Sequence, residues 1–344
     1  MRPTVLLTAV ISVLFWPAWP ATRYVSKDGS AQFPYLLLCT AANSIQDAVD
    51  AAEEGETVLV MARDYAEQVT LKEAISLRGE GPDRTVITGS RESPGAVLTL
   101  ADRTSVCSLG VCRGEEGIHA RDSAIQVWDC WIYHAGWRGV ALVGCSVSVR
   151  GCRFWDCGTY LLDLIACRAE ILDSAFRGPG YSECVLLSQV SVARCHFSGT
   201  SIAAREFAEL RAEDCTFSDG HGVEATVSSD ALLIRCRLMN NAWGVYLSDG
   251  GHATLQSCII SGTCTENPWD SWIQGSAVYC DHENGGVEVI GCTITDNDFG
   301  LRTPASALYP PSVPRRNRGL HRLGKRSGGR VLRPRPGQTV SVPQ

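Results

Sequence analysis

The chain has 344 residues, 45% of them hydrophobic, and a formal net charge of −6. This length and apolar content are ample for one extended domain. The negative charge argues against nucleic acid as a partner. We therefore expect one elongated domain whose partner is not a nucleic acid.

The N-terminus carries an apolar run from Thr4 to Trp19, which follows a single basic residue and precedes small residues. This arrangement is typical of a secretory signal peptide. We predict that residues 1–21 are a signal peptide and that the mature protein is secreted, periplasmic or on the cell surface. A membrane anchor is the alternative, but the run is short for a spanning helix and Pro17 and Pro20 interrupt it. After removal of the signal we expect no stable membrane insertion.

Residues 44–54 predict a short amphipathic helix. Ser44 and Asp47 suit a capping box at its start, and Gly55 suits its C-terminal stop. Its apolar face comprises Ile45, Ala48, Val49 and Ala52. An uncovered end of a sheet is an open edge, so we expect this helix to cap the first turn of the fold. Short strands are expected next, at residues 57–60, 68–71, 75–79 and 85–89.

One pattern then recurs with a period of about 21 residues: a cysteine or serine, with an apolar residue two positions later. Each repeat holds three short bursts of alternating apolar and polar residues, separated by Gly, Asn and Asp. Three strands in about 21 residues are typical of one rung of a parallel β-helix. The repeats begin at Cys130, Cys152, Ser174, Cys195, Cys215, Cys236 and Cys258, and the register returns at Cys292. We predict an all-β, right-handed parallel β-helix of about ten or more rungs over residues 22–303.

Stacking of the rungs places equivalent side chains in columns along the axis. The cysteine column is expected to point inward as free, buried thiols, because Cys behaves as a small hydrophobe. A parallel ladder lacks the convergent geometry of a metal site, so we expect no metal there. Among the other cysteines, Cys264 with Cys280 and then Cys107 with Cys112 are the best candidates for disulfides. The second inward column is expected to be Ile132, Phe154, Phe176, Phe197, Phe217, Leu238, Ile260 and Ile294.

The segment from Ser44 to Gly89 resembles the opening of the pectin-lyase-like superfamily. The resemblance rests on Ser-Ile-Gln-Asp-Ala-Val-Asp-Ala-Ala at 44–52 and Leu-Arg-Gly-Glu-Gly at 77–81. Residues 24–29 also look like the opening of pectin methylesterases, and the later rungs resemble generic right-handed β-helix repeats. The resemblance implies the fold from Tyr24 to Thr303 and leaves the reaction open, because such rungs carry many activities and none.

Two regions depart from the repeat. The rung from Cys258 to Cys292 is longer than the others, and we expect its surplus, residues 262–272, to form an excursion. Residues 304–344 contain nine Lys or Arg and no Asp or Glu, which leaves 22 basic and 37 acidic residues elsewhere. Such a tail suits binding to nucleic acid or acidic polysaccharide. We favour a disordered basic extension that does not join the solenoid.

Catalytic motifs of the resembled families are mostly missing. Asp219 followed by Gly220-His221-Gly222 matches a short motif of polygalacturonases, which makes Asp219 and His221 candidate catalytic residues. The adjacent aspartates and the other motifs expected with it are absent from the sequence. We favour a role in a turn for both residues, because glycoside cleavage needs two carboxylates at a defined separation.

Aromatic residues form the second group of candidates. Trp131 and Tyr133 flank inward Ile132, so period-2 alternation turns them outward. Trp269, Asp270 and Trp272 gather in the excursion. Outward rings beside polar groups suit stacking on sugars, although they could equally cover the rung surface.

These observations favour a secreted, non-catalytic β-helix that binds a polysaccharide or cell-surface glycan, or has a structural role at the cell surface. The alternative is a lyase, hydrolase or epimerase that acts on an acidic, pectin-like polysaccharide. An accessory role in periplasmic metal handling lacks a ligand set in the sequence. We expect a monomer that needs no metal and no organic cofactor.

Overall fold

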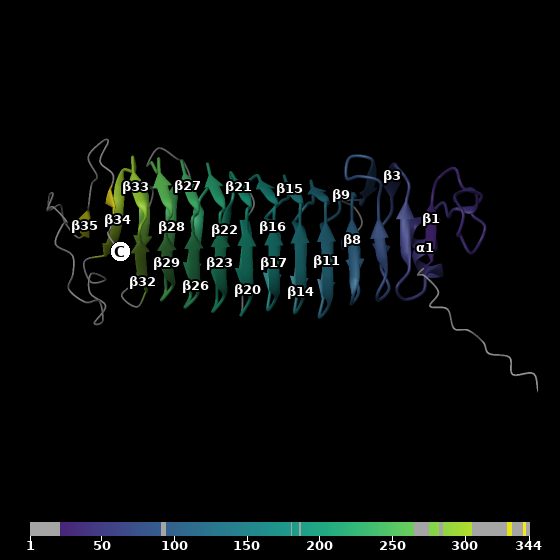
Figure 1. Ribbon diagram of the computed structural model, residues 1–344, viewed down its shortest axis with the longest axis horizontal. Coiled ribbons are helices and arrows are strands. Elements are labelled where there is room, and N and C mark those ends of the chain that lie inside the picture. The colour runs from purple at the N-terminus through teal and green to yellow at the C-terminus, as the bar shows by residue number, and fades with distance from the viewer. Residues whose placement is uncertain are drawn as a thin grey trace, which may run out of the picture.

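Three sheets, parallel except for one antiparallel strand at the C-terminal end of two of them, run along the described solenoid and enclose one elongated core (Figure 1). The computed structural model describes residues 21–90, 94–179, 181–185, 187–264, 275–281, 285–304, 329–331 and 340–341. Each sheet has 12 strands, as expected for ten or more rungs. The fold class predicted from the repeat is therefore confirmed.

From β2 to β34, successive strands belong to sheets A, B and C in turn. Sheet A contains β1 (Thr22–Val25), β2 (Thr57–Val60), β5 (Ser76–Arg78), β8 (Thr104–Cys107), β11 (Ala124–Trp128), β14 (Ser146–Arg150), β17 (Arg168–Leu172), β20 (Gln189–Ala193), β23 (Glu209–Glu213), β26 (Asp230–Ile234), β29 (His252–Gln256) and β32 (Gly286–Ile290). Sheet B contains β3 (Arg63–Ala66), β6 (Thr85–Thr88), β9 (Gly110–Cys112), β12 (Trp131–Tyr133), β15 (Arg153–Trp155), β18 (Ala175–Arg177), β21 (His196–Ser198), β24 (Thr216–Ser218), β27 (Arg237–Met239), β30 (Ile259–Ser261), β33 (Thr293–Thr295) and β36 (Val340–Ser341). Sheet C contains β4 (Val69–Thr70), β7 (Ala96–Leu100), β10 (Glu116–Arg121), β13 (Arg138–Val143), β16 (Tyr160–Ile165), β19 (Tyr181–Val185), β22 (Ser201–Arg205), β25 (Gly222–Thr226), β28 (Trp243–Ser248), β31 (Ser276–Cys280), β34 (Phe299–Pro304) and β35 (Gly329–Val331).

The corners of each rung depend on single residues with a left-handed backbone. Between β11 and β12 this residue is Asp129, with φ of 50°, and between β24 and β25 it is Asp219, with φ of 57°. Asp and Asn tolerate this conformation better than most residues. The polar residues that punctuate the repeat therefore stand where the chain turns from one sheet to the next.

The cysteine column is confirmed. Cys130, Cys152, Cys195, Cys215, Cys236, Cys258 and Cys292 are buried free thiols. Each thiol donates a hydrogen bond to the carbonyl two residues earlier, as Cys215 does to Glu213 at 3.3 Å. Ser174 occupies the same register and donates to the carbonyl of Leu172 at 2.8 Å. A small side chain that can donate to this carbonyl therefore suits the corner.

The second inward column is an aromatic stack. The rings of Phe154, Phe176, Phe197 and Phe217 are nearly parallel, with successive centroids 4.6, 4.7 and 4.8 Å apart. These spacings equal the distance between neighbouring strands. The expected column is confirmed, and each ring contributes to a core that no single rung could bury.

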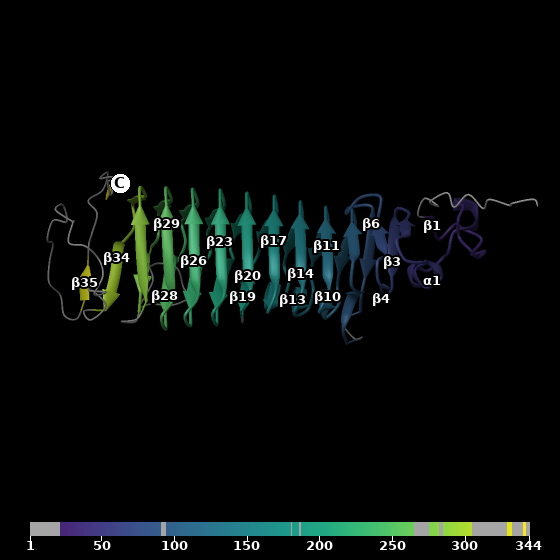
Figure 2. The same ribbon diagram turned by 60° about the horizontal axis from the view of Figure 1, so that its bottom comes forward.

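The N-terminal end is covered as predicted, by α1 (Ile45–Ala51), beside β1 (Figure 2). The helix is shorter than the expected 44–54, because Ala52 is already extended. Ser44 accepts from the Asp47 amide at 3.4 Å. Glu67 completes the cap, since its Oε2 accepts from the Ile45 amide at 2.9 Å. A carboxylate at a helix N-terminus is stabilising.

Two expectations differ from the structure. Cys264 is an exposed free thiol, and Cys107 and Cys112 are also free, so neither predicted disulfide forms. These cysteines lie in separate strands or corners instead of facing each other. In the basic tail, β35 and β36 pair antiparallel with β34 and β33 of the last rung. These two short segments join the solenoid, contrary to expectation, whereas the disorder predicted for the rest of the tail falls outside the described residues.

Candidate functional site

The outer face of sheet C carries a row of side chains that includes two buried carboxyl groups, those of Asp163 and Glu224. In β25 the neighbours of this position, Val223 and Ala225, belong to the core, and the same holds for the neighbours in β10, β13, β16, β22, β28 and β31. Period-2 alternation therefore places the row on the outer face. In register along the axis it comprises His119, Ala141, Asp163, Glu183, Ala203, Glu224, Tyr246, Tyr279 and Arg302. We call this set the sheet C row.

The N-terminal part of the row is a closed ion network. Arg138 donates from Nη1 to Asp163 Oδ2 at 2.9 Å and also pairs with Glu116. His119 Nδ1 lies 3.0 Å from Glu116 Oε2. The ring of Trp137 covers the guanidinium at 3.8 Å. One arginine thus satisfies two carboxylates under an aromatic cover, which suits a structural role.

Glu224, further along the row, is in a different environment. Its residue is 6% exposed, and burial raises the pKa of its carboxyl above the ordinary value. Arg205, one rung away, opposes this shift and donates from Nη2 to Glu224 Oε2 at 3.3 Å. Ala203, the preceding member of the row, has only a methyl group. The carboxyl therefore lies beside a small residue and favours its protonated form more than an exposed glutamate does.

An aromatic wall borders Glu224 on its C-terminal side. His221 and Trp243 stack with ring centroids 4.6 Å apart, and Tyr246 and Tyr279 stack at 5.9 Å. Burial raises the pKa of Tyr279 to about 12, so its hydroxyl remains protonated, and it lies 3.2 Å from Asp281 Oδ1. Trp243 and Tyr279 are buried, so His221 and Tyr246 are the half-buried rings that solvent can reach. The predicted residue His221 thus belongs to this wall, whereas Asp219 is an exposed corner residue.

The two predicted aromatic residues of sheet B point outward, as expected. Tyr133 stacks on Trp155 at 4.5 Å, and Trp131 contacts the same ring edge-to-face at 5.7 Å. Both are half-buried and belong to a different sheet from Glu224. Trp269, Asp270 and Trp272 lie outside the described residues, so their role in glycan binding stays a prediction.

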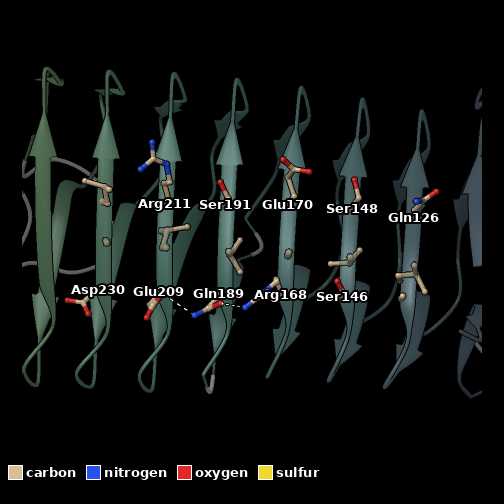
Figure 3. Close-up of a pocket in the computed structure, with 18 of the residues that line it drawn as sticks. Gln126, Ser146, Ser148, Arg168, Glu170, Gln189, Ser191, Glu209, Arg211 and Asp230 are labelled. Atoms are coloured by element: carbon tan, nitrogen blue, oxygen red, sulfur yellow. Dashed lines mark hydrogen bonds between the residues drawn. The ribbon is translucent and has the colours of Figure 1, made fainter. Parts of the chain in front are cut away.

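Sheet A carries a shallow groove of about 1060 Å³ lined by residues of nine successive strands from β5 to β29. Eight steps of about 4.8 Å give it a length of roughly 38 Å. Figure 3 shows a polar ladder on its surface, in which Arg168 donates to Gln189 at 2.9 Å and Gln189 donates to Glu209 at 3.3 Å.

The charges of this groove are mixed. Its lining includes three arginines and three carboxylates, namely Arg103, Arg168, Arg211, Glu170, Glu209 and Asp230. Exposed Leu187 and Phe207 immediately precede the strands at its edge, both with left-handed backbones. The groove therefore suits contact along a polymer without a strong charge preference. The buried acid with a raised pKa, Glu224, lies on sheet C, so this groove and the perturbed carboxyl occupy different faces.

Glu224 is not among the candidates predicted from the sequence, because its place in the row depends on how the rungs align. The signal was present in the burst Gly222-Val223-Glu224-Ala225, whose third residue points outward. When the third residue of this burst is aligned with its equivalents in the other rungs, these residues form the sheet C row. Among the described residues, no three His, Cys, Asp or Glu side chains gather as a metal site, and no helix is long and apolar enough to cross a membrane.

The family model described as "Right handed beta helix region" matches residues 168–307. No curated protein matches the chain. Among solved structures, alginate lyase from Paenibacillus sp. str. FPU-7 is 14% identical, with a TM-score of 0.50 over 61% of this chain and 90% of that one. Polygalacturonase from Erwinia carotovora ssp. carotovora is 10% identical, with a TM-score of 0.47 over 79% of this chain and 95% of that one. At these identities the likeness shows the fold alone.

Proposed function

Because this chain is a right-handed parallel β-helix repeat protein with the pectin-lyase-like fold, we propose that it cleaves a polysaccharide on the outer face of sheet C. Glu224 is the proposed general acid. The observation that carries this proposal is the burial of the Glu224 carboxyl in a row of outward side chains, with a raised pKa. The alginate lyase similar in fold acts on a polysaccharide, which supports the class of substrate.

A protonated carboxyl is the group that glycoside cleavage requires at the leaving oxygen. Burial keeps the proton on Glu224 at a higher pH than it would remain on an exposed glutamate. Arg205 limits this effect and stabilises the carboxylate once the proton has left. The pair therefore suits a group that gives up and regains a proton in each turnover.

Cleavage by hydrolysis also needs a second carboxylate. Glu183 occupies the register position two rungs earlier in the same row, with Ala203 between them. Two strand spacings amount to about 10 Å between these positions. Inverting glycosidases hold their carboxyl groups roughly 6.5–9.5 Å apart to leave room for water. On its register position alone we assign Glu183 as the base; Ala203, between the two acids, is buried.

The aromatic wall is the proposed subsite for the adjacent sugar. Trp243, Tyr246 and Tyr279 follow Glu224 along the axis. Trp243 and Tyr279 are buried and support Tyr246, so a chain bound along the row would contact the half-buried ring of Tyr246 beside the acid. Secretion would give the protein access to such polymers, and we include an extracytoplasmic location and a monomeric state in the proposal.

The test is turnover on a panel of neutral and uronic polysaccharides, with separate assays for reducing ends and for unsaturated ends. We expect new reducing ends, lost by about 10²–10⁴-fold in Glu224→Gln and in Glu183→Gln. Glu209→Gln on sheet A is the matched control and should keep full activity. Unsaturated ends would assign a lyase reaction instead of hydrolysis. Turnover that survives Glu224→Gln but is abolished by Asp219→Asn would place the catalytic site at the corner between β24 and β25, which contains Asp219.

The second candidate function is glycan binding without cleavage, which the groove of sheet A favours. Its length of roughly 38 Å and mixed charge suit an extended polymer better than a small molecule. Retention on a polysaccharide that falls at least tenfold in Arg168→Ala with Phe207→Ala, but not in Glu224→Gln, would support it. Absence of any turnover on the panel would then favour this function over cleavage.

A further inference from the structure

An exposed apolar loop projects from the N-terminal end of the solenoid, between β1 and α1. Phe33, Leu36, Leu37 and Leu38 are 73%, 43%, 61% and 50% exposed. Pro34 and Tyr35 complete this segment, which we call the apolar loop (residues 33–38). None of its six residues is charged. Four large apolar side chains exposed on one loop are uncommon on a soluble surface and mark an interaction site.

The loop is held in place by its own backbone. At its base, Ser30 donates to the Cys39 carbonyl at 3.1 Å, and Gln32 donates to the Thr40 carbonyl at 3.1 Å. Nearer the tip, the Tyr35 amide donates to the Gln32 carbonyl at 3.1 Å. The exposure is therefore a property of an ordered segment, and docking would cost little conformational entropy.

The loop is also tied to the first strand. The Tyr24 amide donates to the Tyr35 carbonyl at 2.8 Å. Arg23 Nη1 donates to the Pro34 carbonyl at 2.8 Å. These bonds fix the loop beside β1, whose first residue follows the apolar run Thr4–Trp19 by only a few positions in the sequence. The strand that holds the loop is thus the first element after the uncharged N-terminal run.

These features favour lipid over a protein partner. A segment that enters the edge of a bilayer needs apolar side chains, no charge and internally paired backbone groups. The apolar loop meets the first two conditions, and the Tyr35 amide and the Pro34 and Tyr35 carbonyls within it are paired. We propose that the apolar loop docks on a lipid bilayer and holds the N-terminal end of the solenoid against it. This docking is peripheral, involves no spanning segment and is independent of the proposed function.

Two cysteines allow a direct test. Among the described cysteines, Cys39 and Cys264 are the exposed ones, at the loop and near the opposite end of the solenoid. An environment-sensitive fluorophore on Cys39 in Cys264→Ser reports on the loop. The same label on Cys264 in Cys39→Ser is the matched control. With neutral phosphatidylcholine vesicles we expect a blue shift and at least a twofold increase in emission from Cys39 alone. No response at Cys39, or an equal response at both, would overturn the proposal.

A second measurement separates the loop from the apolar run. The full chain with Leu37→Glu and Leu38→Glu should co-sediment with these vesicles at least tenfold more weakly than the parent. Both side chains are half or more exposed, so the melting temperature should not change. Leu187→Glu changes an equally exposed leucine far from the loop and should bind like the parent. Unchanged binding of the loop variant would assign vesicle binding to residues 4–19 and overturn the proposal. If the parent does not bind vesicles but self-associates, and the loop variant loses this self-association, the proposal is also overturned. The loop would then dock on a second copy of the chain.

Discussion

Arg205 donates a hydrogen bond from Nη2 to Oε2 of Glu224 at 3.3 Å, from the neighbouring strand of sheet C. The side chain of Arg205 is 38% exposed, whereas that of Glu224 is 8% exposed. The guanidinium therefore keeps much of its hydration, and the carboxyl loses most of its own. Desolvation is the larger influence on the acid, and the pKa of Glu224 is raised despite the positive neighbour.

This raised pKa predicts how stability depends on pH. A carboxyl with a raised folded pKa holds its proton more tightly in the folded state, so its contribution is fully present below the unfolded pKa of about 4.3. The contribution is lost as pH rises through the folded pKa. Glu224→Gln cannot ionise, so its melting temperature should exceed that of the parent at pH 7. The two should converge below about pH 4. A less stable variant at pH 7 would show that the pair with Arg205 outweighs desolvation.

The cysteine column predicts a sharp difference between two substitutions of one residue. Cys215→Ser should cost about 1–2 kcal/mol, because Ser174 already occupies an equivalent corner with the same hydrogen bond. Cys215→Asp should cost about 4 kcal/mol or more, because a carboxylate would lose its hydration inside the core. Urea unfolding of both variants provides the measurement, and similar costs would argue against a tightly packed inward column.

Thiol accessibility tests the same column independently. Burial raises the pKa of the Cys130 thiol well above its ordinary value and shields it from reagents. A thiol reagent should modify Cys39 and Cys264 in the native, unreduced protein and leave the column cysteines unmodified until denaturation. Mass spectrometry of the modified peptides gives the pattern. Disulfides among the column cysteines would contradict the assignment.

The phenylalanine stack predicts a graded response to side-chain size. Phe197→Ala should destabilise the protein by about 3–5 kcal/mol, because it removes one ring between two neighbours at 4.7 and 4.8 Å. Phe197→Leu should cost less, roughly 1–2 kcal/mol, since Leu238 fills the same column position nearby. Equal costs would mean that the stacked rings themselves, and not the volume they fill, stabilise the column.

Removal of the residues after Pro304 is expected to affect self-association more than thermal stability. A chain that ends at Pro304 lacks β35 and β36 and leaves the edges of β34 and β33 unpaired. Unpaired edges favour contact between molecules. We expect an unchanged melting temperature and increased self-association by light scattering. A large loss of melting temperature, with no self-association, would show that the tail supports the core of the last rung.

The sequence alone determined the rung. Cys at one corner and an apolar residue two positions later recur with a nearly constant period. This pattern requires a stacked solenoid, because only stacking buries both columns at once. The helix beginning after Ser44 was equally readable from its apolar face and cap. These features depend on residues that are close together in the sequence, so the local pattern of apolar and polar residues predicts them.

The candidate site depended on how the rungs align. Asp163 pairs with Glu183 and Tyr160 with Tyr181, so the second pair is one position further apart in the sequence, because the register shifts between Tyr160 and Leu162. A shift of one residue would turn an acid from the outer face into the core. Rung lengths vary, and the sequence does not say in which turn or strand the difference is taken up. Only the packed structure, in which each strand pairs with the one before it, brings positions 183, 203 and 224 into one row.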